Sequence, residues 1–264
     1  FNGMVAIGMT FVIITGGIDL SVGSVLALGA LFTTSMCTQE NPGSLVVAIL
    51  VGLAVATACG FLNGLMITKG KMAPFIATMA MMTMARGASL LFCNGRPIIN
   101  LTDEFKEIGT GSLLLPIPIL VFFLVIIVAY LVLYRSRFGR KVFAVGGNEA
   151  AARASGVNID RVKISVYMIS SFLAGLSGII LAARMSAGSP IVGEGYELDA
   201  IAAAVIGGTS LSGGVGSVFG TVIGTLIIGI ISNGLDILNV SSYYQDIVKG
   251  LIIVIAVLID RKRD

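Results

Sequence analysis

The chain has 264 residues, of which 56% are hydrophobic and only 12% are charged, with a mean hydropathy of +1.00. Because a soluble domain carries about 25% charged residues, this composition excludes an ordinary soluble domain and predicts a protein embedded in a lipid bilayer. The net charge is +3 and histidine is absent, which removes the most frequent general base, proton relay and metal ligand.

Apolar runs of sufficient length to cross a bilayer occur along the whole sequence. A helix needs roughly 20 apolar residues to span about 30 Å of hydrocarbon. Two shorter runs, Phe1–Thr15 and Val22–Cys37, are interpreted as further spans, and the first looks truncated, so we expect an N-terminal segment to be missing. The six longer runs are Leu45–Thr68, Ala73–Cys93, Leu114–Tyr134, Ile164–Ala183, Val215–Leu235 and Tyr243–Ile259.

A ninth apolar run, Leu198–Ile206, is too short to cross a membrane. Broken backbone is not tolerated in contact with lipid, so this half-helix must pack against protein or line a wet cavity. The sequence therefore predicts an all-α fold, a polytopic transmembrane helical bundle with broken or half helices. We expect residues 1–264 to form a single transmembrane domain of about eight spans plus the half-helix.

Basic residues indicate the orientation of the bundle. Cytoplasmic loops of membrane proteins carry an excess of lysine and arginine, and the intervening loops of this chain are mainly acidic. The central loop, Tyr134–Lys163, and the C-terminus are therefore predicted to be cytoplasmic. Twelve of the 17 Lys and Arg residues fall on this side: Lys69, Lys71, Arg135, Arg137, Arg140, Lys141, Arg153, Arg161, Lys163, Arg261, Lys262 and Arg263.

Four polar residues in or beside the predicted spans are candidates for a translocation path: Asp19, Ser21, Asn63 and Arg86. An intramembrane carboxylate indicates a functional site, but Asp19 also fits a cap for a helix that begins near Val22, and capping is the preferred interpretation. Asn63 fits an interhelical hydrogen bond or a contact with a solute. Arg86 fits snorkelling to the outer interface, which is slightly favoured, or a place along the path.

The central loop predicts a short helix outside the membrane, over about Glu149–Ser155. Asn148 is a good N-cap, Glu149 favours the positive end of the helix dipole, and Gly156 suits the position after the last turn. Such a helix presents an alanine-lined surface to a partner, although an ordinary connector would show the same pattern. The residues concerned are Asn148, Glu149, Ala150, Ala151, Ala152, Arg153, Ser155 and Gly156.

Several motifs resemble those of the ribose-, galactose- and xylose-type ABC importer permeases. They are Gly-Gly-Ile-Asp-Leu-Ser-Val-Gly-Ser at 16–24, Pro-Phe-Ile-Ala-Thr at 74–78, the loop at 146–156, and Gly-Gly-Thr-Ser-Leu-Ser-Gly-Gly at 207–214. The motifs cover nearly the whole chain in the expected order. Branched-chain amino-acid permeases are a related group, but the match at 19–21 and 74–78 is closer to the sugar group.

The resemblance implies a permease subunit of a monosaccharide importer, with a ribose-like pentose as the first expectation. It implies a multi-pass homodimer in the bacterial inner membrane, a partner ATP-binding cassette subunit and a periplasmic sugar-binding protein. The loop Asn148–Gly156 would then be the coupling helix that inserts into the ATPase. ATP and Mg are expected in the partner, because no Gly-Lys-Ser/Thr phosphate cradle occurs in this chain.

Other functional classes are less consistent with the sequence. An ion-coupled secondary transporter, which is the alternative, would require several buried carboxylates or histidines, and only Asp19 is present in the predicted membrane region. An intramembrane enzyme would require a nucleophile with a base or a metal cluster. No such pair is visible, and Cys37, Cys59 and Cys93 lack metal-ligand spacing. We therefore expect no catalytic residue, no bound metal and no nucleic-acid partner. The expected partners are the lipid bilayer and the proteins named above.

Overall fold

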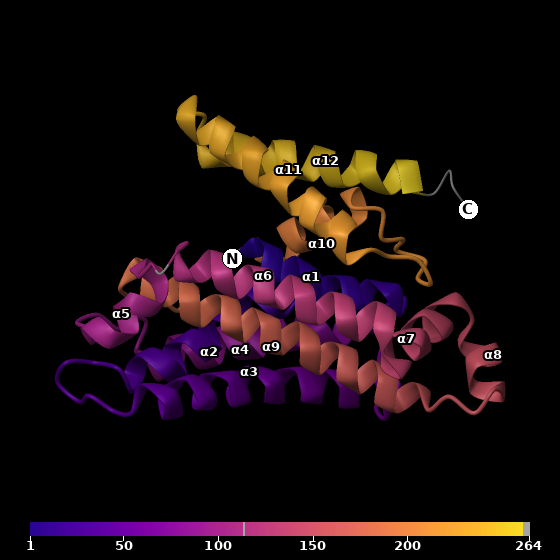
Figure 1. Cartoon of the computed structure of the whole chain (residues 1–264), viewed down its shortest axis with the longest axis horizontal. Coiled ribbons are helices and arrows are strands. Elements are labelled where there is room, and N and C mark those ends of the chain that lie inside the picture. Colours follow the sequence, from indigo (N-terminus) through magenta and orange to yellow (C-terminus); the bar gives the residue numbers. More distant parts are fainter. Residues whose placement is uncertain (113, 261–264) are drawn as a thin grey trace.

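The computed structural model describes residues 1–112 and 114–260. These residues form twelve α-helices and one short π-helix, with no extended strand among them. The prediction of an all-α fold is confirmed. Most of the helices run side by side along the long axis of the molecule, and the connecting segments gather at its two ends (Figure 1). The single-domain organisation over 1–264 stays a prediction.

The helix at the centre of the bundle is α9 (Ile159–Met185), which packs against α1 (Asn2–Ile14), α2 (Val22–Ser35) and α3 (Leu45–Thr68). About two thirds of its most apolar stretch of 18 residues is buried inside the protein. Small residues allow the helix backbones to approach closely. A Cβ atom at Gly60 of α3, for example, would overlap the carbonyl oxygen of Tyr167 on α9.

Within the part of the chain that the structure describes, five helices are long and apolar enough to cross a membrane. They are α3, α4 (Pro74–Phe92), α6 with its π-helical continuation η1 (Ile117–Tyr130 and Leu131–Arg135), α9, and α11 (Val218–Ile237). Their positions match five of the six long runs in the sequence. The helices α1 and α2 are apolar but shorter, as their runs predicted. The last predicted span coincides with α12 (Ser242–Asp260).

The predicted half-helix is α10 (Tyr196–Ile206), which begins two residues earlier than expected. It packs between α1 and the hairpin of α11 and α12, and the hairpin lies farthest from α3 in the molecule (Figure 1). Residues 200 to 205 of α10 are all buried. This short helix is therefore covered by protein, as the physical argument about broken backbone requires.

Two further helices lie where the sequence analysis expected loops. In the connection between α4 and α6, residues 93–116, which we call the outer loop, α5 (Asp103–Thr110) buries Phe105 and starts with Asp103 and Glu104 at the positive end of its dipole. In the central loop, α7 (Arg137–Gly147) buries Val142 and Val145 while its basic residues stay exposed. Both helices are amphipathic and short, so they lack the long apolar run that identified the spans.

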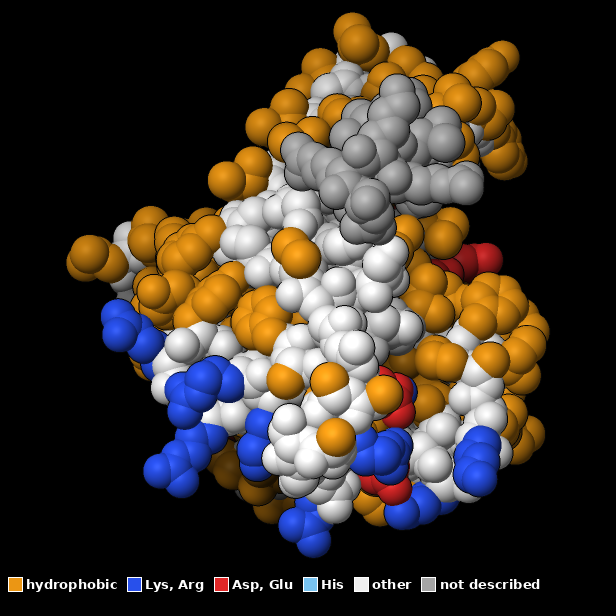
Figure 2. All heavy atoms as spheres, turned by 90° about the vertical axis from the view of Figure 1, so that its right-hand side faces the viewer, with side chains coloured by type: hydrophobic (Ala, Val, Ile, Leu, Met, Phe, Trp, Pro, Cys, Tyr) orange, Lys and Arg blue, Asp and Glu red, His pale blue; other side chains and the backbone are white. Residues whose placement is uncertain are grey.

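The end of the molecule that bears α7 and α8 (Glu149–Ala154) carries most of the visible positive charge. Viewed from this end, lysine and arginine side chains surround the tip and apolar side chains cover the flanks (Figure 2). The positive-inside rule makes this the cytoplasmic end, and that orientation stays a prediction. The C-terminal cations Arg261, Lys262 and Arg263 lie outside the described residues.

Candidate functional site

The helix α8 is built from the residues that predicted it. The Oδ1 atom of Asn148 accepts a hydrogen bond from the backbone N–H of Ala151 at 2.9 Å, which is the predicted N-cap. The helix ends at Ala154 rather than at Ser155, which is its C-cap. Gly156 follows with a φ of +80°, the left-handed conformation that favours glycine. The sequence therefore located this helix to within one residue.

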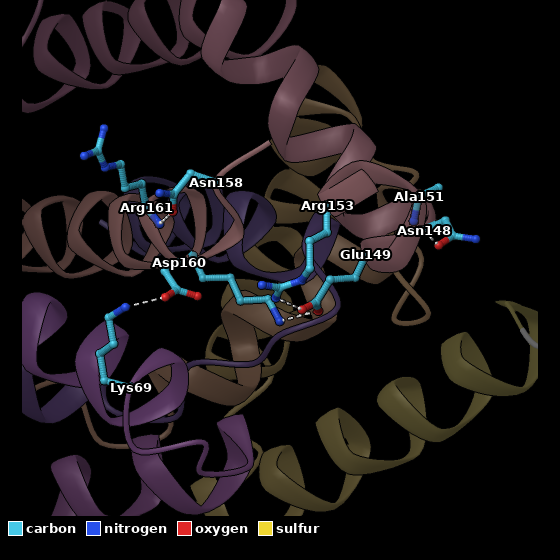
Figure 3. Close-up of polar contacts among 9 residues, drawn as sticks. Lys69, Asn148, Glu149, Ala151, Arg153, Asn158, Asp160 and Arg161 are labelled. Atoms are coloured by element: carbon cyan, nitrogen blue, oxygen red, sulfur yellow. Dashed lines mark hydrogen bonds and ion pairs between the residues drawn. The ribbon is translucent and has the colours of Figure 1, made fainter. Parts of the chain in front are cut away.

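An ion pair fastens α8 to the central helix α9. Glu149 accepts from Arg153 at 3.3 Å through Oε1 and from Lys163 of α9 at 2.7 Å through Oε2. The hydrogen bond from Lys163 is the main cause that lowers the pKa of the Glu149 carboxyl. One turn before Lys163, Asp160 pairs with Lys69 at the end of α3 at 2.6 Å (Figure 3). Glu149 thus connects helices of its own chain, a role that the sequence did not reveal.

One face of α8 is free for a partner. Ala150, Ala151 and Ala154 are exposed, whereas Ala152 is only 4% exposed and packs into the hydrophobic core. Ala152 therefore anchors α8 to the hydrophobic core and does not contribute to the exposed surface. Beside α8, a groove of about 460 Å³ runs between α9 and the end of α3, lined by Lys69, Lys71, Glu149, Arg153, Asp160 and Lys163 among others.

A buried polar cluster lies where the α1–α2 connection meets α9. Asp19 is 0% exposed. Its Oδ1 atom accepts from the N–H and the hydroxyl of Ser21 at 3.1 and 2.6 Å, and its Oδ2 atom accepts from the Ser170 hydroxyl at 2.9 Å. Ser21 has helical dihedrals and stands directly before α2, so its N–H bond to Asp19 is the capping contact that the preferred interpretation predicted. Through Ser170 the carboxylate also joins the start of α2 to α9.

Asn63 extends this cluster to α3. Its Nδ2 atom donates to the Ser21 hydroxyl at 2.9 Å, which confirms the predicted interhelical hydrogen bond. Because Ser21 has given its one proton to Asp19, its oxygen accepts, and this fixes the orientation of the Asn63 amide. The Oδ1 atom of Asn63 and the hydroxyl of Ser171 on α9 are both buried without a hydrogen-bond partner. Two unsatisfied polar groups therefore lie on the facing helices α3 and α9.

Arg86 is half-buried and binds the connection between α9 and α10. Its Nη1 atom donates to the carbonyl oxygen of Pro190 and, at 3.2 Å, to that of Val192, both in the connection between α9 and α10. The guanidinium thus binds backbone carbonyls of the protein itself, and both the snorkelling interpretation and the place along the path stay predictions. Nothing in the local sequence near Arg86 indicates a partner more than 100 positions away.

Sequence reasoning also missed a second buried carboxylate. Asp199 was not among the candidates from the sequence, but it lies in α10 and is only 6% exposed. It pairs with Lys249 of α12 at 3.2 Å and accepts from Asn2 of α1 at 3.1 Å. Its position one residue inside the predicted half-helix was the feature of the sequence that could have identified it as a buried carboxylate.

Among the described residues, no group of three or more potential metal ligands was found. Comparison with known proteins places the chain in a family. Residues 2–257 match the family described as branched-chain amino acid transport system, permease component. The chain belongs to this family. It is a multi-pass membrane permease subunit of an ABC-type importer, the non-catalytic transmembrane component, and the resemblance noted in the sequence is confirmed.

Individual relatives are similar over nearly the whole chain. The ribose import permease protein of Bacillus subtilis (strain 168) is 50% identical over 99% of this chain and 82% of that protein. The ribose import permease protein of Escherichia coli (strain K12) is 47% identical over 99% and 83%. The D-allose transport system permease protein of the same strain is 37% identical over 98% and 79%. No solved structure matches the chain.

Proposed function

We propose that this chain is the membrane conduit of an importer for ribose, driven by ATP hydrolysis in a separate subunit through α8. The identity of 47–50% to ribose import permeases, against 37% to the D-allose permease, supports ribose as the solute. The observation that carries the coupling mechanism is that α8 exposes an alanine face while its Glu149 is paired with Lys163 of α9.

Coupling works through the central helix. A partner ATPase that grips the surface around α8 moves a helix that is tied to α9 through Glu149 and Lys163. Because α9 packs along α1, α2 and α3, its displacement alters the packing of the bundle core. ATP and Mg belong to the partner subunit. The solute and the partner must favour different conformations, since a ligand shifts an equilibrium only through differential affinity.

The translocation path passes the buried polar cluster. In the present conformation α3 and α9 enclose Asp19, Ser21 and Asn63. When these helices separate, the unpartnered groups of Asn63 and Ser171 are suited to hydrogen bonds with the hydroxyls of a sugar. Alternating access then means that the cluster opens to one side of the membrane at a time.

The remaining partners follow from the orientation of the bundle. We place the chain in the bacterial inner membrane with α8 and the C-terminus in the cytoplasm, because the basic residues gather at that end (Figure 2). The outer loop with α5 and the segment before α10 face a periplasmic sugar-binding protein. The subunit acts as a homodimer, and neither nucleic acid nor a metal ion has a part in the mechanism.

Reconstitution tests the proposal directly. Proteoliposomes with the permease, the ATPase subunit and a ribose-binding protein are expected to take up ribose only when all three proteins and ATP are present. Ala151→Trp on the exposed face of α8 is expected to abolish uptake and ATPase binding while membrane insertion is retained. Ala144→Trp on α7, which is also exposed, is the control. Normal uptake in Ala151→Trp, or uptake driven by an ion gradient without ATPase, would contradict the proposal.

A further inference from the structure

The connection between α9 and α10, residues 186–195, is an irregular strap near the outer end of the bundle. Ser186, Gly193 and Gly195 have φ values of 55°, 77° and 81°, so this backbone is neither helical nor extended throughout. Pro190 and Gly193 are buried. We call residues 186–195 the outer strap. Irregular backbone of this kind is stable at membrane depth only where other protein groups satisfy its carbonyls and amides.

Arg86 provides hydrogen bonds to two of these backbone carbonyls at the middle of the outer strap. Its Nη1 atom donates to the carbonyl oxygens of both Pro190 and Val192. It lies six residues before the end of α4, about 9 Å along the helix from that end at 1.5 Å per residue. Among the described residues, no carboxylate forms an ion pair with Arg86. The guanidinium is therefore held by the two carbonyl oxygens, and the nearby carboxylates of Glu194 and Glu197 attract it without forming an ion pair.

The two ends of the outer strap contact segments that the proposed function assigns to different tasks. At its start, Gly188 exchanges two backbone hydrogen bonds of 2.8 Å with Ile98 of the outer loop. Towards its end, the carbonyl oxygen of Gly193 approaches Gly23 so closely that a Cβ atom there would overlap it. Gly23 is the second residue of α2, directly after the connection that carries Asp19. The outer strap thus joins the outer loop to the edge of the buried polar cluster.

We propose that Arg86 is a positioning residue for transport, which latches the outer strap closed over the outer end of the path. An external partner that docks on the outer loop and shifts the Ile98–Gly188 pair pulls the outer strap away from Arg86 and exposes the start of α2. This inference rests on the proposed function. It replaces a direct role of Arg86 in contacting the solute with a role in holding the backbone.

Chemical labelling of the outer strap tests the latch. Because Arg86 binds backbone carbonyls, Val192→Cys leaves both acceptors in place. The reporter is introduced into a chain in which Cys37, Cys59 and Cys93 are replaced by serine, and a membrane-impermeant maleimide is added to the purified protein in lipid nanodiscs. Arg86→Gln is expected to raise the labelling rate of residue 192 by about tenfold, because hydrogen bonds to a charged group contribute substantially to the closed state.

Two further variants make the result specific. Arg86→Lys retains the positive charge, but its ammonium falls short of the Nη1 position, so a smaller rise is expected. Arg96→Gln removes an exposed arginine from the neighbouring outer loop and is expected to leave labelling unchanged. An unchanged rate in Arg86→Gln, or an equal rise in Arg96→Gln, overturns the proposal. Should Arg86→Gln fail to accumulate, the absence of any rise in Arg86→Lys overturns it as well.

The hydrolysis of ATP gives a second readout. In the complex with the ATPase subunit, Arg86→Gln is expected to hydrolyse ATP at an increased rate without the binding protein, whereas Arg96→Gln is not. Labelling requires neither ribose nor ATP. A failure of ribose uptake in the parent protein would therefore refute the proposed function, while a failure of labelling to change would refute only the latch.

Discussion

The ion pair between Glu149 and Lys163 gives the sharpest test of how α8 acts on α9. Its atoms are 2.7 Å apart, and the two side chains are 45% and 21% exposed. A partly exposed pair of this kind contributes up to about 1 kcal/mol. Replacing one partner by a residue of the opposite charge adds a repulsion of similar size. We expect Lys163→Glu or Glu149→Lys to weaken the attachment of α8 by about 1–2 kcal/mol, a factor of about 5–30 in its equilibrium.

The assay is the number of ATP molecules hydrolysed for each solute molecule transported in proteoliposomes. Each single reversal is expected to raise this number, because the partner subunit then moves α8 without moving α9. The double reversal restores the pair between positions 149 and 163 and should lower the number again in part, because a lysine at position 149 also repels Arg153. Lys141→Glu, an exposed residue of α7, is the control for a change of net charge. If the double reversal couples no better than the worse single variant, the ion pair is not the connection.

The other predictions concern the turn, the core and the pH dependence. Gly156→Ala forces a left-handed φ of +80° on alanine, costs about 1–2 kcal/mol, and should abolish uptake while membrane insertion, measured by fractionation, persists. Asp19→Ala leaves three buried donors unpaired, so the melting temperature in detergent should fall well below that of Asp19→Asn. Gly60→Ala should disrupt the α3–α9 contact, whereas Gly87→Ala, with open space around it, should not; thermal melting distinguishes them. The pKa of Glu149 is lowered in the folded protein, so the stabilisation of α8 by this carboxylate is complete above about pH 4.3, the unperturbed pKa of glutamate. The stabilisation is lost as the pH falls through the lower pKa of the folded state. A fluorophore on α8 reports the release of the helix.

Much of the fold could be predicted because a bilayer imposes simple local rules. Long apolar runs are forced to become spans, so α3 was predicted with its observed bounds and α4 to within one residue at each end. The helix α8 was equally accessible, since its cap at Asn148 and its stop at Gly156 act within one turn of the backbone. The amphipathic helices α5 and α7 were missed because a short helix that buries only one face leaves no long apolar run.

The sequence alone therefore determined where the chain crosses the membrane, where the exposed helix α8 lies and to which family of permeases the chain belongs. Only the tertiary structure decided which polar groups meet. Lys163 lies 14 positions from Glu149, Ser170 lies 151 positions from Asp19, and Pro190 lies 104 positions from Arg86. Contacts at such separations depend on the packing of whole helices around α9, and no local pattern of residues encodes that packing.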